Sequence, residues 1–466
     1  MAKVSFDTFW QAAKKGLRPE IVFPVLAMTA GLCMVFVNAP FQAPDEASHF
    51  WRAYHVYKGN FISTKQGNLS GGMIPKSVAQ AHLPFEYLVG KNENRVEPHV
   101  IANGLKESFN KHDRIFVGMG FAALYSPVVY LPQVTGIAIG RILGLSALGM
   151  MYSARIMNLL FWIVVTTAAI RITPVFKWVF LLVALLPMNM FLAASLSADA
   201  PADGVTSLLL ALVLWALWKK DTLHWPHLLA IGVSCVLLAF IKLPYVPLAG
   251  LILLIPASRF SGLKNKQFFC AIVFALILAG VWVWSSAIKD LYTPIHGANA
   301  PEQLTIVKEH PWEFVEVLAD TVQKHWRGYV VSFIGLLGFL DTPLPNWVYL
   351  SYPLVLMVTA LFDRGLGELL GVKQRLWIIA ICLGVSVLIA LSMYLTWTPP
   401  GEKIIEGIQG RYFLPLAVPG LLAVFYNRKW EFPAGSLGPL LIAGYSVSVL
   451  IMTCLCLYDR YFAAVS

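Results

Sequence analysis

The chain contains little charge, because Asp, Glu, Lys and Arg make up only 13% of its 466 residues while hydrophobic residues make up 58%. Soluble domains carry about a quarter charged residues. The apolar residues gather instead into runs of the length that crosses a bilayer, about 20 residues. Every backbone group in such a run must be hydrogen-bonded internally, which favours helices. The composition therefore predicts an all-α polytopic membrane protein, folded as a single integral-membrane domain over residues 1–466.

Several common site motifs are also missing. The six cysteines lie in or beside apolar runs, so we expect no disulfide framework and no thiolate metal site. The sequence has no P-loop, no Rossmann glycine fingerprint, no His-x-x-x-His or Cys-x-x-Cys spacing and no nucleophile elbow. We therefore predict no required cofactor and no metal ligands. The net charge of +10 is not clustered into a basic face, which argues against nucleic acid as a partner.

Eleven apolar runs are predicted to be transmembrane helices. They are Ile21–Ala39, Met150–Ile170, Val175–Ala194, Ala202–Trp218, His227–Ile241, Leu243–Pro256, Phe268–Ala287, Trp347–Phe362, Leu376–Trp397, Tyr412–Tyr426 and Leu437–Tyr458. Two further stretches, Phe116–Ile139 and Tyr329–Leu340, are ambiguous, and about thirteen helices would result if both crossed.

The positions of Lys and Arg decide between these two topologies. If both ambiguous stretches crossed, Lys219, Lys220 and the basic cluster of residues 259–266 would move outside, against the positive-inside rule. We therefore predict a cytoplasmic N-terminus, with residues 116–139 and 329–340 re-entrant or interfacial. Residues 40–115 and 288–328 then form large non-cytoplasmic loops. No cleavage pattern of small residues follows the first run, so we expect it to be retained as an anchor.

The most distinctive polar cluster directly follows the first apolar run. Pro44 suits the first position of a helix, so we expect a surface helix on which Asp45, His49 and Arg52 share one face. A helix cap would account for one acid, but Asp45 and Glu46 supply two carboxylates. Ionisable groups at membrane depth are usually functional. The cluster therefore predicts the start of an active site.

Two later motifs place further charge on the same side of the membrane. Asp199 and Asp203 lie four residues apart at the start of an apolar run. Asp199 could simply cap the helix, whereas Asp203 lies within the run and needs a partner. Arg411, between Gln409 and Tyr412, opens another run from the outer side. It could snorkel to lipid phosphate or hold a substrate phosphate bidentately, with Gln409 and Tyr412 as neutral hydrogen-bonding neighbours.

Three weaker candidates are basic residues. Lys242 stands alone between two short runs, where snorkelling explains it and a phosphate contact is an alternative. His325 and Arg327 flank Trp326, which could be an aromatic-belt anchor. Substrate contacts by His325 and Arg327 stay open.

Five short motifs follow one another in an order that resembles a known family. They are Pro44-Asp45-Glu46-x-x-His49-Phe50-x-Arg52-Ala53, Tyr125-Ser126-Pro127 with Tyr130-Leu131-Pro132-Gln133, Ser195-x-Ser197-Ala198-Asp199-Ala200, Asp341-Thr342-x-Leu344-Pro345 and Gly407-x-Gln409-Gly410-Arg411-Tyr412-Phe413-x-Pro415. The chain is similar to the domain-of-unknown-function 2142 family, whose members are predicted to be of the GT-C type. An acidic motif directly after the first span also resembles the GT-C superfamily of membrane glycosyltransferases.

This resemblance implies a GT-C-like helical bundle and a reaction. Such enzymes transfer a sugar from a polyprenyl-phosphate donor to a glycan or lipid-linked acceptor on the non-cytoplasmic face. Asp45 resembles the first-loop acid that serves as base or positions the acceptor, and Glu46 is its neighbour and a possible substitute. Asp199 falls near the second acidic position of the superfamily, although its local pattern differs. Some members use a divalent metal, so a weakly bound one is possible here.

We therefore expect a glycosyltransferase of the bacterial cytoplasmic (inner) membrane, with its site facing the periplasm and membrane lipids around it. Asp45 would act as general base, and Arg411, helped by Lys242 or Arg52, would stabilise the leaving phosphate. Two alternatives stay open. One is a transporter or flippase of lipid-linked sugars, although we find no internal repeat of the kind that many transporters contain. The other is a polymerase or ligase of lipid-linked glycans.

Overall fold

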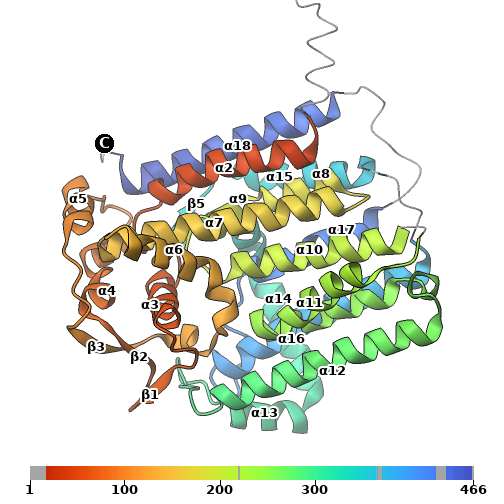
Figure 1. Ribbon diagram of the computed structural model, residues 1–466, viewed down its shortest axis with the longest axis horizontal. Helices are drawn as coiled ribbons and strands as arrows, with labels where there is room; N and C mark the ends of the chain where they lie inside the picture. Colours follow the sequence, from red (N-terminus) through yellow and green to blue (C-terminus); the bar gives the residue numbers. More distant parts are fainter. Residues whose placement is uncertain (1–16, 219–220, 364, 366–369, 427–436, 464–466) are drawn as a thin grey trace, which may run out of the picture.

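The computed structural model describes residues 17–218, 221–363, 365, 370–426 and 437–463. Helices dominate this part of the chain, and the long ones lie roughly side by side (Figure 1). The predicted class, an all-α polytopic membrane protein, is confirmed.

Within the described ranges, six helices are long and apolar enough to cross a membrane. They are α2 (Pro19–Val37), α7 (Ala147–Ile172), α10 (Asp199–Trp218), α12 (Leu263–Ile288), α16 (Val372–Thr396) and α18 (Gly438–Tyr461). Shorter apolar helices are α11 (Trp225–Ile241), η4 (Leu243–Leu254), α15 (Asn346–Phe362), and η6 (Gly410–Phe413) continuing into α17 (Leu414–Phe425). These segments correspond to all but one of the predicted runs.

The exception is the predicted run Val175–Ala194, which is not one continuous helix. It is divided into α8 (Lys177–Ala184) and α9 (Pro187–Ala193), both of them buried among the other helices. Pro187 explains the break, because proline lacks the backbone N–H that a helix interior requires and clashes with the preceding turn.

Neither ambiguous stretch forms a membrane-length helix of its own. Residues 116–139 contain the end of β3 (Arg114–Gly118), then η2 (Gly120–Leu124), η3 (Pro127–Tyr130) and most of α6 (Leu131–Ile142). Residues 329–334 complete α14 (Pro311–Ile334), a helix that begins inside the predicted loop of residues 288–328. The predicted boundary between that loop and a separate segment at residue 329 therefore falls within a helix. The hairpin of β4 (Leu336–Leu337) and β5 (Thr342–Pro343) follows.

The loop after α2 folds into a cap at one end of the long helices, on the left in Figure 1. It contains α3 (Glu46–Tyr57), α4 (Lys76–Gln80), η1 (Leu83–Leu88), α5 (Pro98–Lys106) and an antiparallel sheet. The sheet has the order β1 (Thr64–Gln66), β2 (Leu69–Pro75), β3 (Arg114–Gly118), with Gly71 opposite both Thr64 and Gly118. Gly72 of β2 lies so close to His55 of α3 that an added Cβ would stand 2.2 Å from the imidazole. This contact holds α3 in place.

The remaining elements are η5 (Ala257–Phe260) and α13 (Ala300–Glu309). The chain's last described helix, α18, is held to the cap and to the β4–β5 hairpin by Arg460. Its Nε (3.1 Å) and Nη2 (2.7 Å) donate to Asp341 Oδ2, and Nη2 also donates to the carbonyl of Leu88 (2.8 Å).

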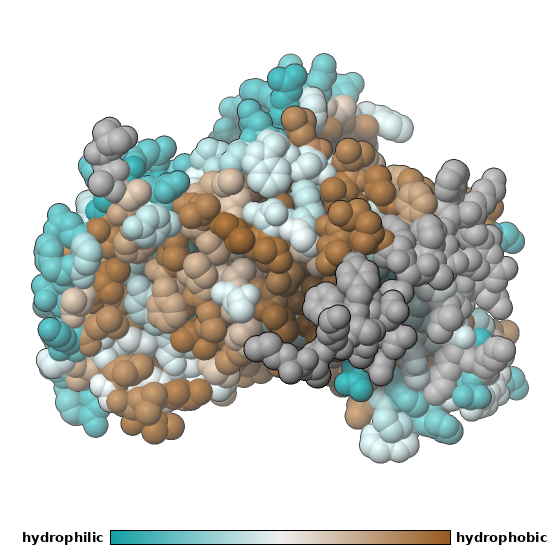
Figure 2. All heavy atoms as spheres, turned by 90° about the horizontal axis from the view of Figure 1, so that it is seen from above, coloured by the Kyte–Doolittle hydropathy of each residue, from teal (hydrophilic) through white to brown (hydrophobic). Residues whose placement is uncertain are grey.

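Figure 2 views the face that carries α2 and α18. Hydrophobic residues cover its middle and hydrophilic residues gather at its left end, where the cap lies. Exposed apolar side chains of α2 and α18, such as Val25 and Leu441, are what a lipid-facing surface requires.

Candidate functional site

Asp45 lies just outside the helix that was expected to carry it. It is the N-cap residue of α3, which begins at Glu46, and its backbone is left-handed (φ 60°). Asp tolerates this conformation better than most residues. Because Asp45 precedes the helix, the predicted face shared by Asp45, His49 and Arg52 does not form. The Asp45 carboxylate is exposed and, among the described residues, makes no hydrogen bond.

The neighbouring carboxylate, Glu46, has the opposite environment. Glu46 and Arg155 of α7 form a bidentate ion pair in which both side chains are 0% exposed. Arg155 Nε donates to Oε1 (2.8 Å) and Nη2 to Oε2 (2.5 Å), and the backbone N–H of Leu196 also donates to Oε1 (3.1 Å). The other Arg155 donors bind the carbonyls of Val35, Asn38 and Ala39 at the end of α2. Glu46 therefore joins three segments and is not available as a substitute for Asp45.

Sequence reasoning missed Arg155, although a signal was present. Arg155 lies inside the predicted run Met150–Ile170, and a charged residue at that depth needs a partner. Its partner is 109 residues away in the sequence, so pairing it with Glu46 required the fold.

Arg52 and His49 are also buried, and each has hydrogen-bond partners in neighbouring segments. Arg52 donates to the carbonyls of Asn60 (3.1 Å), Phe61 (2.6 Å) and Tyr125 (3.2 Å), which closes the first loop. Burial lowers the pKa of Arg52 to about 10. His49 Nδ1 lies 2.8 Å from the Tyr130 hydroxyl. Burial lowers the pKa of His49, an effect that the Asp45 charge opposes. Arg52 is therefore a structural residue rather than a phosphate ligand.

Asp199 pairs with cations from two other segments. Its Oδ1 accepts from the Lys242 ammonium, and its Oδ2 lies 3.7 Å from Arg411 Nε. The ammonium of Lys242 also lies over the Tyr412 ring, 4.7 Å from its centroid. One turn along α10, Asp203 is buried, and its Oδ2 has no hydrogen-bond partner among the described residues. Asp199 is thus a neutralising partner for two buried cations.

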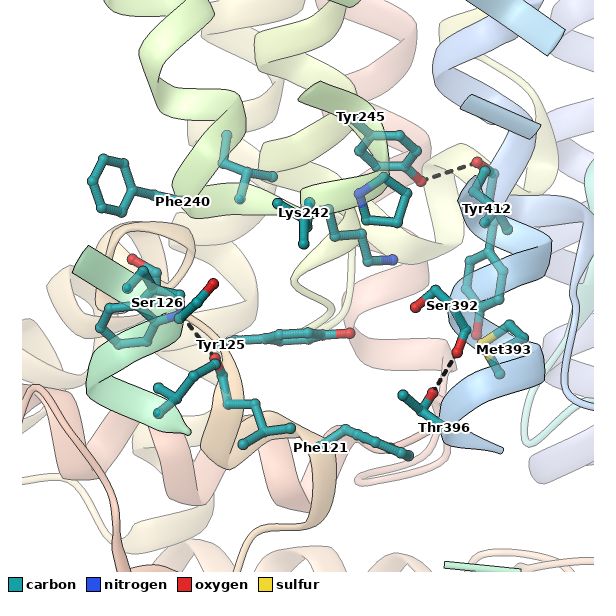
Figure 3. Close-up of a pocket in the computed structure, with 18 of the residues that line it drawn as sticks. Phe121, Tyr125, Ser126, Phe240, Lys242, Tyr245, Ser392, Met393, Thr396 and Tyr412 are labelled. Atoms are coloured by element: carbon teal, nitrogen blue, oxygen red, sulfur yellow. Dashed lines mark hydrogen bonds between the residues drawn. The ribbon is translucent and has the colours of Figure 1, made fainter. Parts of the chain in front are cut away.

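A cavity of about 380 Å³ lies beside this cluster and is lined by Asp45 and Lys242. Figure 3 shows the Lys242 ammonium and the Tyr125 hydroxyl reaching toward its middle from opposite sides. Tyr412 and Gln409 also line it. The Tyr245 hydroxyl donates to the carbonyl of Tyr412 (3.0 Å), which ties two walls together.

The cavity divides the predicted site residues into three groups. Those that line it are Asp45, Lys242, Gln409 and Tyr412. Asp199, Asp203, Arg411 and His49 lie behind its wall as buried neighbours. Glu46 and Arg52 are committed to the fold, and His325 and Arg327 are exposed on α14, outside the cavity lining.

Tyr125 is a cavity residue that the sequence reasoning used only as part of a motif. Its ring stacks on His49, with centroids 6.0 Å apart, and burial raises the pKa of Tyr125 to about 12. The phenol is therefore a neutral hydrogen-bond donor at ordinary pH. Tyrosines at short 3₁₀ segments between prolines, as in Tyr125-Ser126-Pro127, were the available signal.

The residues of the cavity do not fit a bound divalent cation. Hard cations take several oxygen ligands, usually more than one carboxylate. Among the described residues Asp45 is the one carboxylate that lines this cavity, and Lys242 places a positive charge on its wall. No group of three His, Cys, Asp or Glu side chains elsewhere in the described ranges has a metal-binding arrangement.

Comparison with known proteins gives a family. Residues 28–419 match the family described as predicted membrane protein (DUF2142). No curated protein and no solved structure matches the chain. The match covers most of the sequence, from within α2 to within α17. The chain therefore belongs to the DUF2142 family of predicted membrane proteins.

Proposed function

We propose that this protein is a membrane glycosyltransferase that moves a sugar from a polyprenyl-phosphate donor to a glycan or lipid-linked acceptor. The observation that carries the proposal is the make-up of the cavity. An unpaired carboxylate (Asp45) and an ammonium (Lys242) line one cavity, and no other charged side chain of the described residues lines it. A free carboxylate can accept a proton, and an ammonium can hold a phosphate.

The apolar part of the cavity wall supports a lipid-linked donor. Membrane helices α12 and α16 contribute Val281, Ile288 and Ile389, and Phe240 of α11 lies beside them. A prenyl chain is a flexible hydrocarbon that gains from leaving water along such a wall. Its phosphate would then lie at the polar part of the cavity, near Lys242.

The reaction we propose is a single displacement. Asp45 takes the proton of an acceptor hydroxyl while that oxygen forms a bond to the anomeric carbon of the donor sugar. The bond from that carbon to the phosphate oxygen breaks, and its electron pair stays on the phosphate. Lys242 stabilises the negative charge that develops there, as cationic groups do in other sites of this kind.

In this scheme Lys242 stabilises the leaving phosphate, a role that the sequence had led us to expect of Arg411. Arg411 is buried behind the cavity wall and lies 3.7 Å from Asp199. Asp199 and Arg411 are positioning residues, since Asp199 holds the Lys242 side chain from behind. We place the enzyme in the bacterial cytoplasmic membrane, with the cavity and the cap on the periplasmic side, because the positive-inside rule favours that orientation.

The test is sugar transfer by purified protein in nanodiscs with extracted polyprenyl-phosphate sugars and candidate glycan acceptors. We expect transfer by wild type and its loss by about 10²–10⁴-fold in Asp45→Asn, the usual contribution of a general base. Asn keeps the left-handed backbone that Asp45 requires, so the fold should be unchanged. Donor binding in Asp45→Asn, measured separately, should match wild type.

Other outcomes would replace this proposal. If no donor is consumed but labelled lipid-linked sugar crosses a liposome bilayer, the protein is a transporter or flippase. If whole lipid-linked glycans are joined and single sugars are not, it is a polymerase or ligase.

A further inference from the structure

One end of the cavity is built from aromatic rings that the proposed reaction does not use. Phe121 of η2 and Trp397, the residue that follows α16, line it together. Their rings are stacked, with centroids 5.8 Å apart and planes at 28°. His296, from the loop after α12, lies against Trp397 at 4.4 Å between centroids. Three segments far apart in the sequence therefore meet in one aromatic cluster at the cavity.

The position of Trp397 is fixed by its surroundings. Gly407 has a φ of 77°, and a Cβ on it would stand 2.7 Å from Trp397 Cδ1 and 2.6 Å from Met393 Cε. The backbone at Gly407 thus lies flat against the indole. Figure 3 shows Phe121 and Tyr125 nearly edge-on, both directed into the space below Lys242. The rings are preorganised, which lowers the entropy cost of binding.

The polar groups at this end are neutral. Ser392, Thr396 and Gln409 line the cavity here, and Gln409 Oε1 is buried with no hydrogen-bond partner among the described residues. A buried acceptor without a partner is unusual and calls for a ligand donor or water. Flat aromatic faces combined with neutral hydrogen-bonding groups suit a molecule that has both C–H faces and hydroxyls. A sugar ring is such a molecule.

We infer that the end of the cavity formed by Phe121, Trp397 and Gln409 is a subsite for a neutral sugar ring of the acceptor. This inference rests on the proposed function. If the prenyl chain follows the aliphatic wall and the phosphate lies at Lys242, the aromatic end is what remains for the acceptor. The proposed base, Asp45, lines the same cavity.

The first experiment measures sugar binding without catalysis. Protein in nanodiscs is mixed with methyl glycosides of neutral hexoses and N-acetylhexosamines, and contacts are recorded by saturation-transfer NMR. We expect at least one glycoside to bind wild type, and Phe121→Leu and Trp397→Leu to weaken it by about tenfold. Trp312→Leu is the matched control, because Trp312 is 79% exposed on α14, away from the cavity.

The results separate this inference from the proposed reaction. Glycoside binding that depends on Phe121, with no donor consumed, refutes the glycosyltransferase and keeps the sugar subsite. Donor consumption with no glycoside bound, or with binding unchanged in Phe121→Leu and Trp397→Leu, overturns the subsite. If Trp397→Leu does not fold, Phe121→Leu alone decides.

A second measurement tests the assignment to the acceptor. In the transfer assay, Phe121→Leu should raise KM for the acceptor by about tenfold and leave KM for the donor unchanged. The opposite pattern would give these rings to the donor sugar and overturn the assignment.

Discussion

Two buried acids, Glu46 and Asp199, each hold cations inside this protein, and their surroundings differ. Glu46 accepts from two nitrogens of Arg155 and from the backbone N–H of Leu196 and Ala43, and the remaining Arg155 donors all have carbonyl partners. The cluster around Asp199 is incomplete. Arg411 Nε lacks a hydrogen bond with good geometry, and Asp203 Oδ2 lacks any among the described residues.

This difference indicates a structural role for the Glu46 cluster and a ligand-binding role for the Asp199 cluster. A buried polar network in which every group is satisfied rigidifies a fold and has no capacity for a ligand. A network with unmet groups beside a cavity can gain hydrogen bonds when a ligand arrives. Lys242 pairs with Asp199 and also lines the cavity. A ligand bound in the cavity would therefore contact the Asp199 cluster through Lys242.

Breaking the complete cluster should have the largest effect on stability. In Arg155→Met, Glu46 would be left as an unpaired buried carboxylate and three carbonyls at the end of α2 would lose their donors. Removing one partner of a buried pair costs about 3–5 kcal/mol. We expect a large fall in the thermal unfolding temperature in detergent, or no folded protein at all.

The double variant Glu46→Gln with Arg155→Met is the control. It removes the unpaired charge, so it should recover part of the lost stability, since an ion pair replaced as a whole costs much less than a broken one. An Arg155→Met protein as stable as wild type would show that this ion pair does not hold α2, α3 and α7 together.

Breaking the incomplete cluster should instead affect activity. Lys242→Met removes an ammonium that lines the cavity, while Asp199 keeps Arg411 as a counter-ion. Loss of a single charge-stabilising group in an active site typically lowers kcat by about 10²–10³-fold. We expect a loss of transfer of that order, weaker donor binding and a small change in unfolding temperature. Lys403→Met, at an exposed site, is the matched control. Full activity in Lys242→Met would exclude Lys242 as the phosphate ligand.

The same comparison explains which parts of the site and of the fold could be predicted from the sequence. Asp45, Lys242, Gln409 and Tyr412 were all singled out because polar residues at the ends of apolar runs are conspicuous, and all four line one cavity. The helices were predictable for the related reason that long apolar runs have few other ways to fold in a membrane.

What the sequence could not provide was the partner of each charge. Asp45 and Glu46 are adjacent and chemically alike, yet one is exposed in the cavity and the other is sealed against Arg155. A left-handed residue at the start of α3 turns the two side chains apart. Neither that turn nor a contact over 109 residues is encoded in a local pattern. Arg411 was likewise predicted to bind the phosphate. Its position behind the cavity wall depends on packing, which the sequence does not show.

A third buried acid, Asp363, extends the comparison, because its hydrogen-bond partners among the described residues are backbone groups. Asp363, after α15, accepts from the N–H groups of Trp178 (2.6 Å) and Val179 (3.0 Å) at the start of α8. Burial raises the pKa of Asp363 to about 7, although these hydrogen bonds oppose the shift. The folded protein therefore holds this proton more tightly than the unfolded chain, whose Asp titrates near its ordinary pKa of about 4.

Stability should consequently fall as pH rises through this window. Below the unfolded pKa both states are protonated, and between about pH 4 and pH 7 only the folded state binds the proton, so deprotonation favours unfolding. From pH 5 to pH 7 we expect a decrease on the order of 2 kcal/mol in the free energy of unfolding. Asp363→Asn keeps an acceptor for α8 and has no charge, so its unfolding temperature should show a smaller pH slope. An identical slope in both proteins would contradict this assignment.

The smallest effect is expected at the two candidates that the structure separates from both clusters. His325 and Arg327 are exposed on α14, and the Arg327 guanidinium lies over the Trp326 ring, 5.3 Å from its centroid. Exposed side chains without buried partners usually change stability by less than about 0.5 kcal/mol when replaced. His325→Ala and Arg327→Ala should therefore match wild type in unfolding temperature and, within about twofold, in transfer rate. A loss as large as that of Lys242→Met would mean that substrate reaches the outer face of α14. Lys242 would then not be the sole point where ligand meets protein.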